Sequence, residues 1–277
     1  MDVSYIINHL GEERENYFNA ISPPIIQSSN FAFENIEMMR KGLAHEREIS
    51  CYTRGMNPTV DILKKKVAAL EGAEDALIVS SGCAAISSAV ISCIKSGEHI
   101  VCVNNPYGWT NKLMTSFLPN FGISSTLIDG TSPENFKKAI KSNTRVFYLE
   151  SPNSYTFELQ DIVAVSKIAR ENNIITIIDN SYSTSLFQKP LALGADIVVY
   201  SASKYFGGHS DLVAGIICSS KERIDKIFKN EFMTLGNNIS PNDAWLILRG
   251  LRTLPLRMEK ISESTAKVVQ YLKTHPK

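Results

Sequence analysis

The chain has 277 residues, a net charge of +1, and 44% hydrophobic and 21% charged residues. This length allows one large domain or two smaller ones with a substantial core, and the charge gives no reason to expect a nucleic-acid or membrane partner. No apolar run approaches the roughly 20 residues that span a bilayer, and the first residues lack a signal-peptide pattern. The five cysteines and five histidines form no metal-ligand spacing. We therefore expect a soluble cytoplasmic protein with reduced thiols and no metal.

The first part of the chain, residues 1–57, shows no sustained periodicity. Its adjacent prolines, Pro23 and Pro24, favour extended or turn structure rather than helix. Such a long irregular segment is unusual inside a compact chain. We expect residues 1–57 to form an arm that packs against a second subunit.

From Pro58 onward, predicted helices and strands alternate. Pro58 opens a helix that ends at Gly72, and further helices are expected after residue 82 and at 110–121, 133–141 and 161–172. Short apolar strands are expected at 76–80, 100–103, 125–128, 146–149, 174–179 and 195–200. Continuously apolar strands indicate a sheet that is covered on both faces. The alternation predicts a doubly wound, mostly parallel α/β domain over residues 58–240, with ligands beyond the carboxyl ends of its strands.

The most informative segment is Ser201-Ala-Ser-Lys204-Tyr-Phe-Gly-Gly-His-Ser-Asp211. Lys204 follows one predicted strand, and Asp179 ends the strand before it. A lysine that forms a Schiff base, an aspartate that holds a ring nitrogen protonated, and phosphate-binding hydroxyls at Ser201 and Ser203 suit pyridoxal phosphate. In the simpler interpretation, Lys204 is a surface charge, Asp179 caps a turn and the serines only form turns.

A second phosphate-binding candidate is the strand-to-helix turn that contains Ser81, Gly82 and Cys83. Free N–H groups and the helix dipole in such a turn attract an anion. The alternative is an ordinary turn with Ser81 as the helix N-cap, and a single glycine is a weak signal.

Three further residues have polar side chains suited to a flat, phosphorylated ligand. Tyr107 lies in a loop after a strand, where a phenol can stack on the ligand and move protons, although loop tyrosines are common. Arg54, close to Tyr52, either clamps a phosphate or lies on the surface.

Taken together, the motifs resemble the cysteine/methionine-metabolism enzymes that use pyridoxal phosphate. This family includes cystathionine γ-synthase, cystathionine β- and γ-lyases, methionine γ-lyase and O-acylhomoserine sulfhydrylases. The resemblance extends along almost the whole chain. Its motifs are Tyr52-Thr-Arg54-Gly-Met-Asn-Pro-Thr59, Ser80-Ser-Gly-Cys-Ala-Ala-Ile86, Tyr107-Gly, Glu150-Ser-Pro152, Ile178-Asp-Asn180, the lysine segment and Leu248-Arg-Gly-Leu-Arg-Thr-Leu254.

The resemblance implies a type I fold, similar to aspartate aminotransferase, and a role for each candidate. Lys204 would carry the cofactor as an aldimine, Asp179 would pair with its ring nitrogen, and Tyr107 would stack on the ring and assist proton transfer. The phosphate would be held by backbone N–H groups of Gly82 and Cys83 and by hydroxyls of Ser201 and Ser203. Tyr52 and Arg54 would reach the phosphate of a neighbouring subunit, in a dimer or a tetramer built as a dimer of dimers. Asn153 would contact the phenolic oxygen of the cofactor.

The reaction implied by the resemblance is less uniform. The segment from Glu150 to Asp161 looks like that of bacterial cystathionine β-lyases, whereas Arg54 with Asn57-Pro-Thr59 looks like the synthases and γ-lyases. We expect a C–S lyase that acts on cystathionine or a related sulfur amino acid. The alternative is a cystathionine γ-synthase or another O-acylhomoserine γ-replacement enzyme.

Two observations define the rival interpretations. Family members continue into a C-terminal domain that carries the arginine for the substrate carboxylate, whereas residues 241–277 would form only the start of the helix that leads there. A cofactor-binding homologue without turnover is therefore a second alternative. A nicotinamide-dependent dehydrogenase shares the predicted sheet, but no GxGxxG follows any strand.

Overall fold

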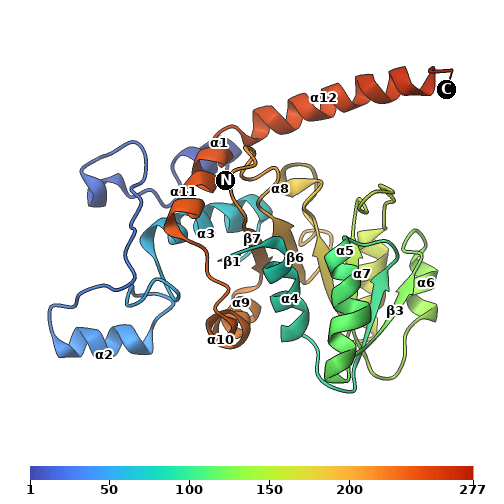
Figure 1. Cartoon of the computed structure of the whole chain (residues 1–277), viewed down its shortest axis with the longest axis horizontal. Helices are drawn as coiled ribbons and strands as arrows, with labels where there is room; N and C mark the ends of the chain where they lie inside the picture. The colour runs from blue at the N-terminus through green and yellow to red at the C-terminus, as the bar shows by residue number, and fades with distance from the viewer. Residues whose placement is uncertain (277) are drawn as a thin grey trace.

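The computed structural model describes residues 1–276 and contains a seven-stranded sheet with helices on both faces (Figure 1). Along the sheet the strand order is β1-β7-β6-β5-β4-β2-β3. The strands are β1 (Asp75–Val79), β2 (His99–Val103), β3 (Ser124–Ile128), β4 (Thr144–Glu150), β5 (Ile175–Asp179), β6 (Ile197–Ser201) and β7 (Gly215–Ser219). Strands β3, β2, β4, β5 and β6 pair in parallel, whereas β7 runs antiparallel to β1 and β6. The predicted mostly parallel sheet is confirmed, with β7 as an additional strand.

Twelve α-helices lie within the described residues 1–276. They are α1 (Val3–Asn8), α2 (Ile36–Ala44), α3 (Pro58–Glu71), α4 (Gly82–Ser92), α5 (Gly108–Lys112), α6 (Pro133–Lys138), α7 (Ile162–Glu171), α8 (Thr184–Phe187), α9 (Lys221–Ile227), α10 (Met233–Leu235), α11 (Pro241–Leu251) and α12 (Leu254–Lys273). Local sequence explains the ends of α3. The Asn57 side chain caps the N–H of Thr59, and Gly72 stops the helix in the left-handed conformation at φ 79°.

The helix predicted at 110–121 is instead composite. It begins as α5, continues as a π-helical turn at Leu113–Phe117 and ends as a 3-10 turn at Leu118–Phe121. Pro119 explains the tighter last turn, because proline has no N–H to continue the α-helical ladder.

The sheet separates two hydrophobic cores. Adjacent residues of β5 show the division, because Ile178 packs into the core beneath α3, α7 and α11, whereas Ile177 packs into the core beneath α4 and α9. Both side chains are fully buried. Successive strand residues face opposite sides of a sheet, so the continuously apolar strands reflect cover on both faces, as predicted.

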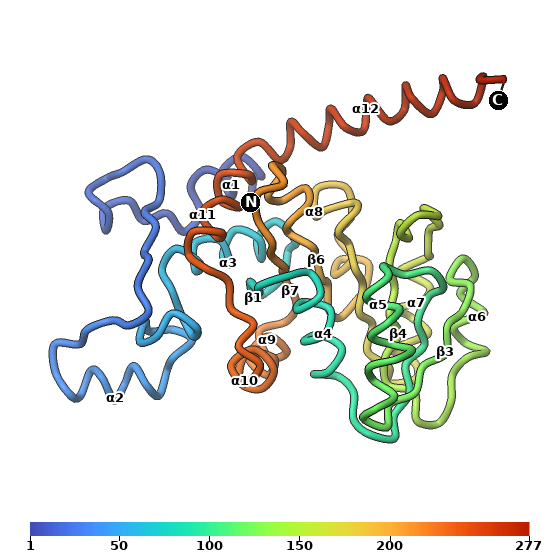
Figure 2. Tube along the Cα trace, viewed as in Figure 1, coloured from blue at the N-terminus to red at the C-terminus, as the bar shows by residue number. Residues whose placement is uncertain are grey.

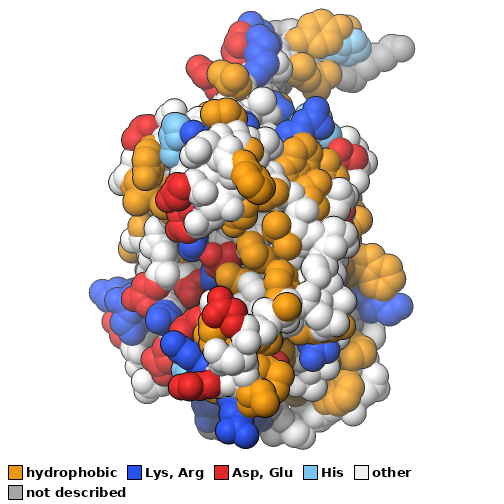
Figure 3. Space-filling model, turned by 90° about the vertical axis from the view of Figure 1, so that its left-hand side faces the viewer, with side chains coloured by type: hydrophobic (Ala, Val, Ile, Leu, Met, Phe, Trp, Pro, Cys, Tyr) orange, Lys and Arg blue, Asp and Glu red, His pale blue; other side chains and the backbone are white. Residues whose placement is uncertain are grey.

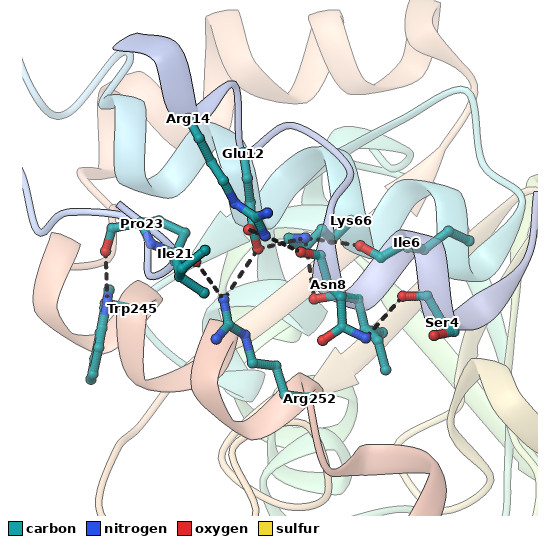
Figure 4. A network of polar contacts seen from close by, with 11 residues as sticks. Ser4, Ile6, Asn8, Glu12, Arg14, Ile21, Pro23, Lys66, Trp245 and Arg252 are labelled. Atoms are coloured by element: carbon teal, nitrogen blue, oxygen red, sulfur yellow. Dashed lines mark hydrogen bonds and ion pairs between the residues drawn. The ribbon is translucent and has the colours of Figure 1, made fainter. Parts of the chain in front are cut away.

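The N-terminal segment begins against the body of the molecule and then leaves it. Buried Lys66 of α3 donates to the carbonyls of Ile6 (2.9 Å) and Ile7 (3.2 Å) and pairs with Glu12 (3.1 Å) (Figure 4). Arg252 reaches the same Glu12 carboxylate from the end of α11 (3.5 Å). The chain beyond these contacts loops outward through α2 before it returns to α3 (Figures 1 and 2).

The predicted arm at 1–57 is thus only partly irregular, since it contains α1 and α2. The domain limits at residues 57 and 240 stay predictions. At the other end of the chain, α12 extends away from the body of the molecule (Figure 1). Within residues 1–276, no helix combines the length and apolarity needed to cross a membrane.

Candidate cofactor-binding site

A cavity of about 470 Å³ opens at the carboxyl ends of β4, β5 and β6, beside the start of α4. This is the edge where a doubly wound sheet binds its ligands. Its lining includes eight of the predicted residues, contributed by separate segments of the chain. They are Ser81, Gly82, Cys83, Tyr107, Asp179, Ser201, Ser203 and Lys204.

Lys204 and Tyr107 face each other within this cavity. The Nζ atom of Lys204 lies 5.5 Å from the centroid of the Tyr107 ring. The backbone N–H of Tyr107 donates to Glu150 Oε2 at 2.8 Å, which fixes the end of the loop where α5 begins. Burial, together with the neighbouring Cys83, raises the pKa of the Tyr107 phenol, so the hydroxyl keeps its proton at neutral pH. Lys204 and Tyr107 therefore place an amine and a phenolic proton in the same cavity.

Asp179 supplies a buried carboxylate at the end of β5. It is 8% exposed, and its Oδ1 accepts from the backbone N–H of Ser181 at 2.9 Å. Burial raises the pKa of Asp179, while the Ser181 hydrogen bond and the Lys204 charge lower it. A buried carboxylate of this kind needs a cationic donor, and a protonated pyridine nitrogen is one. The residue therefore fits pyridoxal phosphate.

Glu150 is a further candidate for a functional role, which its sequence motif alone did not indicate. It ends β4 directly opposite Asp179 in the parallel register and lines the same cavity. Its two oxygens accept from the N–H groups of Tyr107 (2.8 Å) and Ser154 (2.7 Å). Burial and the nearby Asp179 raise the pKa of Glu150. The only sequence signal was its place in Glu150-Ser-Pro152 at a strand end.

The start of α4 provides the elements of an anion site. The Ser81 hydroxyl caps the helix by accepting from the N–H of Ala84 (3.0 Å), as the simpler interpretation of Ser81 predicted. A Cβ atom at Gly82 would lie 3.0 Å from Ser201 Cβ, so glycine allows this close approach. The first N–H groups of a helix have no intrahelical acceptor and attract phosphate.

Hydroxyl groups complete this side of the cavity. Ser201 donates its N–H to the Ser181 hydroxyl at 2.7 Å. Ser181 also lines the cavity, although no motif in the sequence singled it out. Ser203 Oγ accepts from the N–H of Ala214 at 3.0 Å. Helix N–H groups, hydroxyls, a lysine and a buried carboxylate together match the phosphate, aldehyde and ring nitrogen of pyridoxal phosphate.

Three predicted residues lie outside the cavity lining. Asn153 is buried, and its side-chain amide donates to the carbonyls of Asn104 (2.8 Å) and Asn105 (3.1 Å), so it holds the turn that leads to Tyr107. Tyr52 and Arg54 line a different cavity of about 510 Å³, with the guanidinium 5.4 Å from the Tyr52 ring. Among residues 1–276, no group of three His, Cys, Asp or Glu side chains is placed to hold a metal.

The fold and this cavity define the large domain of a type I pyridoxal-phosphate enzyme. Residues 5–277 match the profile of the family described as Cys/Met metabolism PLP-dependent enzyme, and the chain belongs to this family. Pyridoxal phosphate is the cofactor of the family, which confirms the cofactor predicted from Lys204 and Asp179.

Relatives within the family carry different reaction names. The chain is 42% identical over 265 residues to the L-methionine gamma-lyase of Treponema denticola, covering 95% of this chain and 66% of that protein. It is 36% identical to the cystathionine beta-lyase of Lactococcus lactis, covering 96% of this chain and 68% of the relative. The chain thus spans about two thirds of the length of these curated relatives.

A solved structure is similar over the whole chain. It is a putative O-acetylhomoserine (thiol)-lyase from Campylobacter jejuni that contains a pyridoxyl-lysine. It matches with a TM-score of 0.93 and 28% identity and covers 100% of this chain and 76% of its own. The predicted fold class is therefore confirmed.

Proposed function

We propose that the protein is a pyridoxal-phosphate-dependent C–S lyase that acts by elimination on cystathionine or a related sulfur amino acid. One observation carries the proposal: Lys204, Asp179 and Tyr107 come from three separate segments, yet they line one cavity with the start of α4. Family membership supplies the cofactor.

Each residue has a chemical role that follows from its type and place. Lys204 would hold the cofactor through its aldehyde, and its Nζ would take the α-proton of the amino acid. Asp179 keeps the ring nitrogen protonated, and Tyr107 holds or donates a proton from its hydroxyl close to Lys204. Gly82 and Cys83 bind phosphate through their N–H groups, with Ser201 and Ser203 adding hydroxyls. The bound cofactor supplies the electron withdrawal that acidifies the α-hydrogen of the amino acid.

Elimination is favoured by the segment that follows β4. Glu150-Ser-Pro-Asn-Ser resembles the β-lyase pattern, and the relatives include enzymes named as lyases. The competing function is γ-replacement on an O-acylhomoserine. It is supported by the Arg54–Thr59 motif and by the name of the Campylobacter jejuni relative.

We also propose that the active unit is a homo-oligomer in which Tyr52 and Arg54 complete the phosphate site of a neighbouring subunit. Both residues lie outside the cavity of their own chain. The arm that carries them exposes large apolar side chains, and Figure 3 shows several hydrophobic patches among polar and charged side chains on this face. Exposed members of the arm include Phe18, Ile21, Ile36 and Leu43. Burial of such a patch favours association.

The proposed location is the cytoplasm. All five cysteines are free, and two of them, Cys102 and Cys218, are fully buried within strands. Unpaired cysteines are typical of a reducing compartment.

The test is turnover of cystathionine by the purified protein supplied with pyridoxal phosphate. β-Elimination releases pyruvate, ammonia and homocysteine, whereas γ-elimination releases 2-oxobutanoate, ammonia and cysteine. We expect pyruvate and homocysteine in equal amounts, with no turnover by Lys204→Ala. Cystathionine formation from an O-acylhomoserine and cysteine, without elimination, would instead establish the replacement reaction.

A further inference from the structure

A chain of buried hydrogen bonds runs behind the cavity, on the side of the sheet that α3 covers. Glu71, the last residue of α3, is 1% exposed, and its Oε2 accepts from the Tyr200 hydroxyl of β6. Its Oε1 accepts from the N–H of Leu191 at 3.4 Å. The Tyr200 oxygen in turn accepts from Asn180 Nδ2 at 3.2 Å. Over residues 1–276, no cation forms an ion pair with Glu71.

The same network reaches a third strand through Gln188. Gln188 Nε2 donates to Asn180 Oδ1 at 2.9 Å and to the Ser151 carbonyl at 2.8 Å. Asn180 Nδ2 returns a hydrogen bond to the Gln188 carbonyl at 2.9 Å. Tyr200, Asn180 and Ser151 are each no more than 1% exposed, so these polar groups have no water to replace a lost partner.

Three members of this network lie in a strand or directly after one, and each adjoins a residue that lines the cavity. The neighbouring pairs are Tyr200 with Ser201, Asn180 with Asp179, and Ser151 with Glu150. Adjacent residues share a peptide unit, so a hydrogen bond that fixes one residue of a pair also restricts the backbone of its neighbour. The network therefore sets the relative placement of three strand ends that the cofactor must contact together.

We propose that Glu71 is a positioning residue for the cofactor site, whose ionised carboxylate orients Tyr200 and, through Asn180 and Gln188, aligns Asp179 with Ser201. This inference rests on the cofactor site proposed above. An amide N–H of Asn180 can only donate, so the Tyr200 oxygen accepts it and directs its own hydrogen to Glu71. An ionised carboxylate is the strongest acceptor for this hydrogen, because the hydrogen bond is then charge-assisted. Protonation of Glu71 removes that charge and weakens the link to Tyr200.

The setting of Glu71 makes this role sensitive to pH. The titratable groups that face its carboxylate are Tyr200 from β6, Cys218 from β7 and Lys189 from the segment before β6. Burial raises the pKa of Glu71 to about 7, and the Tyr200 hydrogen bond lowers it by less. The aligned, ionised form is therefore present above neutral pH and declines below it.

The experiment measures the dissociation constant of the apoprotein for pyridoxal phosphate by fluorescence titration, from about pH 6 to pH 8.5. The variants are Glu71→Gln, Tyr200→Phe and the double variant. The matched control is Glu171→Gln, which changes an exposed glutamate at the end of another helix, α7. Circular dichroism selects folded protein for each titration, and Tyr200→Phe carries the test if Glu71→Gln fails to fold.

We expect each single variant to bind about tenfold more weakly at pH 8, because Tyr200→Phe removes the buried hydrogen bond and Glu71→Gln replaces its charged acceptor with a weaker neutral one. The double variant should bind no more weakly than the worse single one, because both substitutions break the same link. Below neutral pH the wild-type affinity should fall more steeply than that of Glu71→Gln. The inference is overturned if folded Glu71→Gln binds like Glu171→Gln with an unchanged pH profile, or if the two substitutions add. A wild-type protein that binds no cofactor overturns the proposed site itself, and with it this inference.

Discussion

At the scale of single residues, Asp179 stood out because it ends an apolar strand, where an unpaired charge has a high desolvation cost. Lys204 stood out by its place after the next apolar strand, among serines and glycines, and its side chain is exposed. The sequence pattern gave no comparable signal for Glu150, Ser181 or Glu71. Glu150 and Ser181 reach one edge only because β4, β5 and β6 are neighbours in the sheet, and Glu71 meets Tyr200 only because the end of α3 packs against β6. Asn153 holds the 104–105 turn through its amide N–H groups, while its buried Oδ1 accepts no hydrogen bond within residues 1–276, so its contact with the cofactor stays a prediction.

The residue-scale prediction concerns Asp179→Asn. The amide keeps the shape of the side chain but cannot hold a ring nitrogen protonated. Turnover of cystathionine should fall about 100-fold or more, as expected when one preorganised electrostatic partner is lost. Steady-state kinetics at saturating cofactor measure this effect, and Asp161→Asn, at the exposed N-cap of α7, is the control. Turnover within a few-fold of wild type would refute the role of Asp179.

At the scale of elements, the helices α3, α4, α6 and α7 and the strands β1 to β6 followed from hydrophobic periodicity, proline and glycine, whereas the short helices α8, α9 and α10 were not predicted. β7 was not anticipated, although Gly215–Ser219 has the same apolar run as the other strands. Its antiparallel pairing with β1 and β6 depends on tertiary contacts far along the chain. The composite helix at 108–121 also departs from the periodic pattern, because Pro119 removes a backbone donor.

The element-scale prediction concerns His99, which joins three strands. Its ring nitrogens hydrogen bond Thr144 of β4 (2.9 Å) and Thr126 of β3 (2.8 Å). Burial, and to a smaller extent Lys141, lowers the pKa of His99 to about 4 from an ordinary value near 6.5. The folded state therefore binds fewer protons than the unfolded state between these values. The contribution of the neutral His99 ring to the free energy of unfolding is therefore present above about pH 6.5 and is lost as the pH falls toward 4.

Urea unfolding of the apoprotein between pH 4 and 7 tests this prediction. The free energy of unfolding of the wild type should fall more steeply with decreasing pH than that of His99→Gln, which has no titrating ring. Parallel profiles for the two proteins would show that His99 is not held neutral by the fold.

At the scale of the whole molecule, the double cover of the sheet was predictable, because its strands are apolar on both faces. The arm was only partly predictable. Its docking through Lys66 and Glu12 is a contact between residues about 50 positions apart, which local pattern does not show. The exposed apolar face and the distant placement of Arg54 both support a partner subunit.

The prediction at this scale is complementation between subunits. Arg54→Ala and Lys204→Ala should each lack activity, but a mixture refolded together should regain about a quarter of wild-type turnover. In a two-fold dimer, half of the randomly paired molecules would contain one intact site. Light scattering on each variant confirms that it assembles. No recovery from assembled mixtures would place Arg54 in the site of its own chain or outside the mechanism.

The central claim is that Lys204 is the residue that binds the cofactor. It is tested by incubating the protein with pyridoxal phosphate, fixing the lysine-bound cofactor with borohydride and mapping the modified peptide by mass spectrometry. We expect one pyridoxyl group per chain, on Lys204, and none in Lys204→Ala. Modification spread over several lysines, or retained in Lys204→Ala, would contradict it.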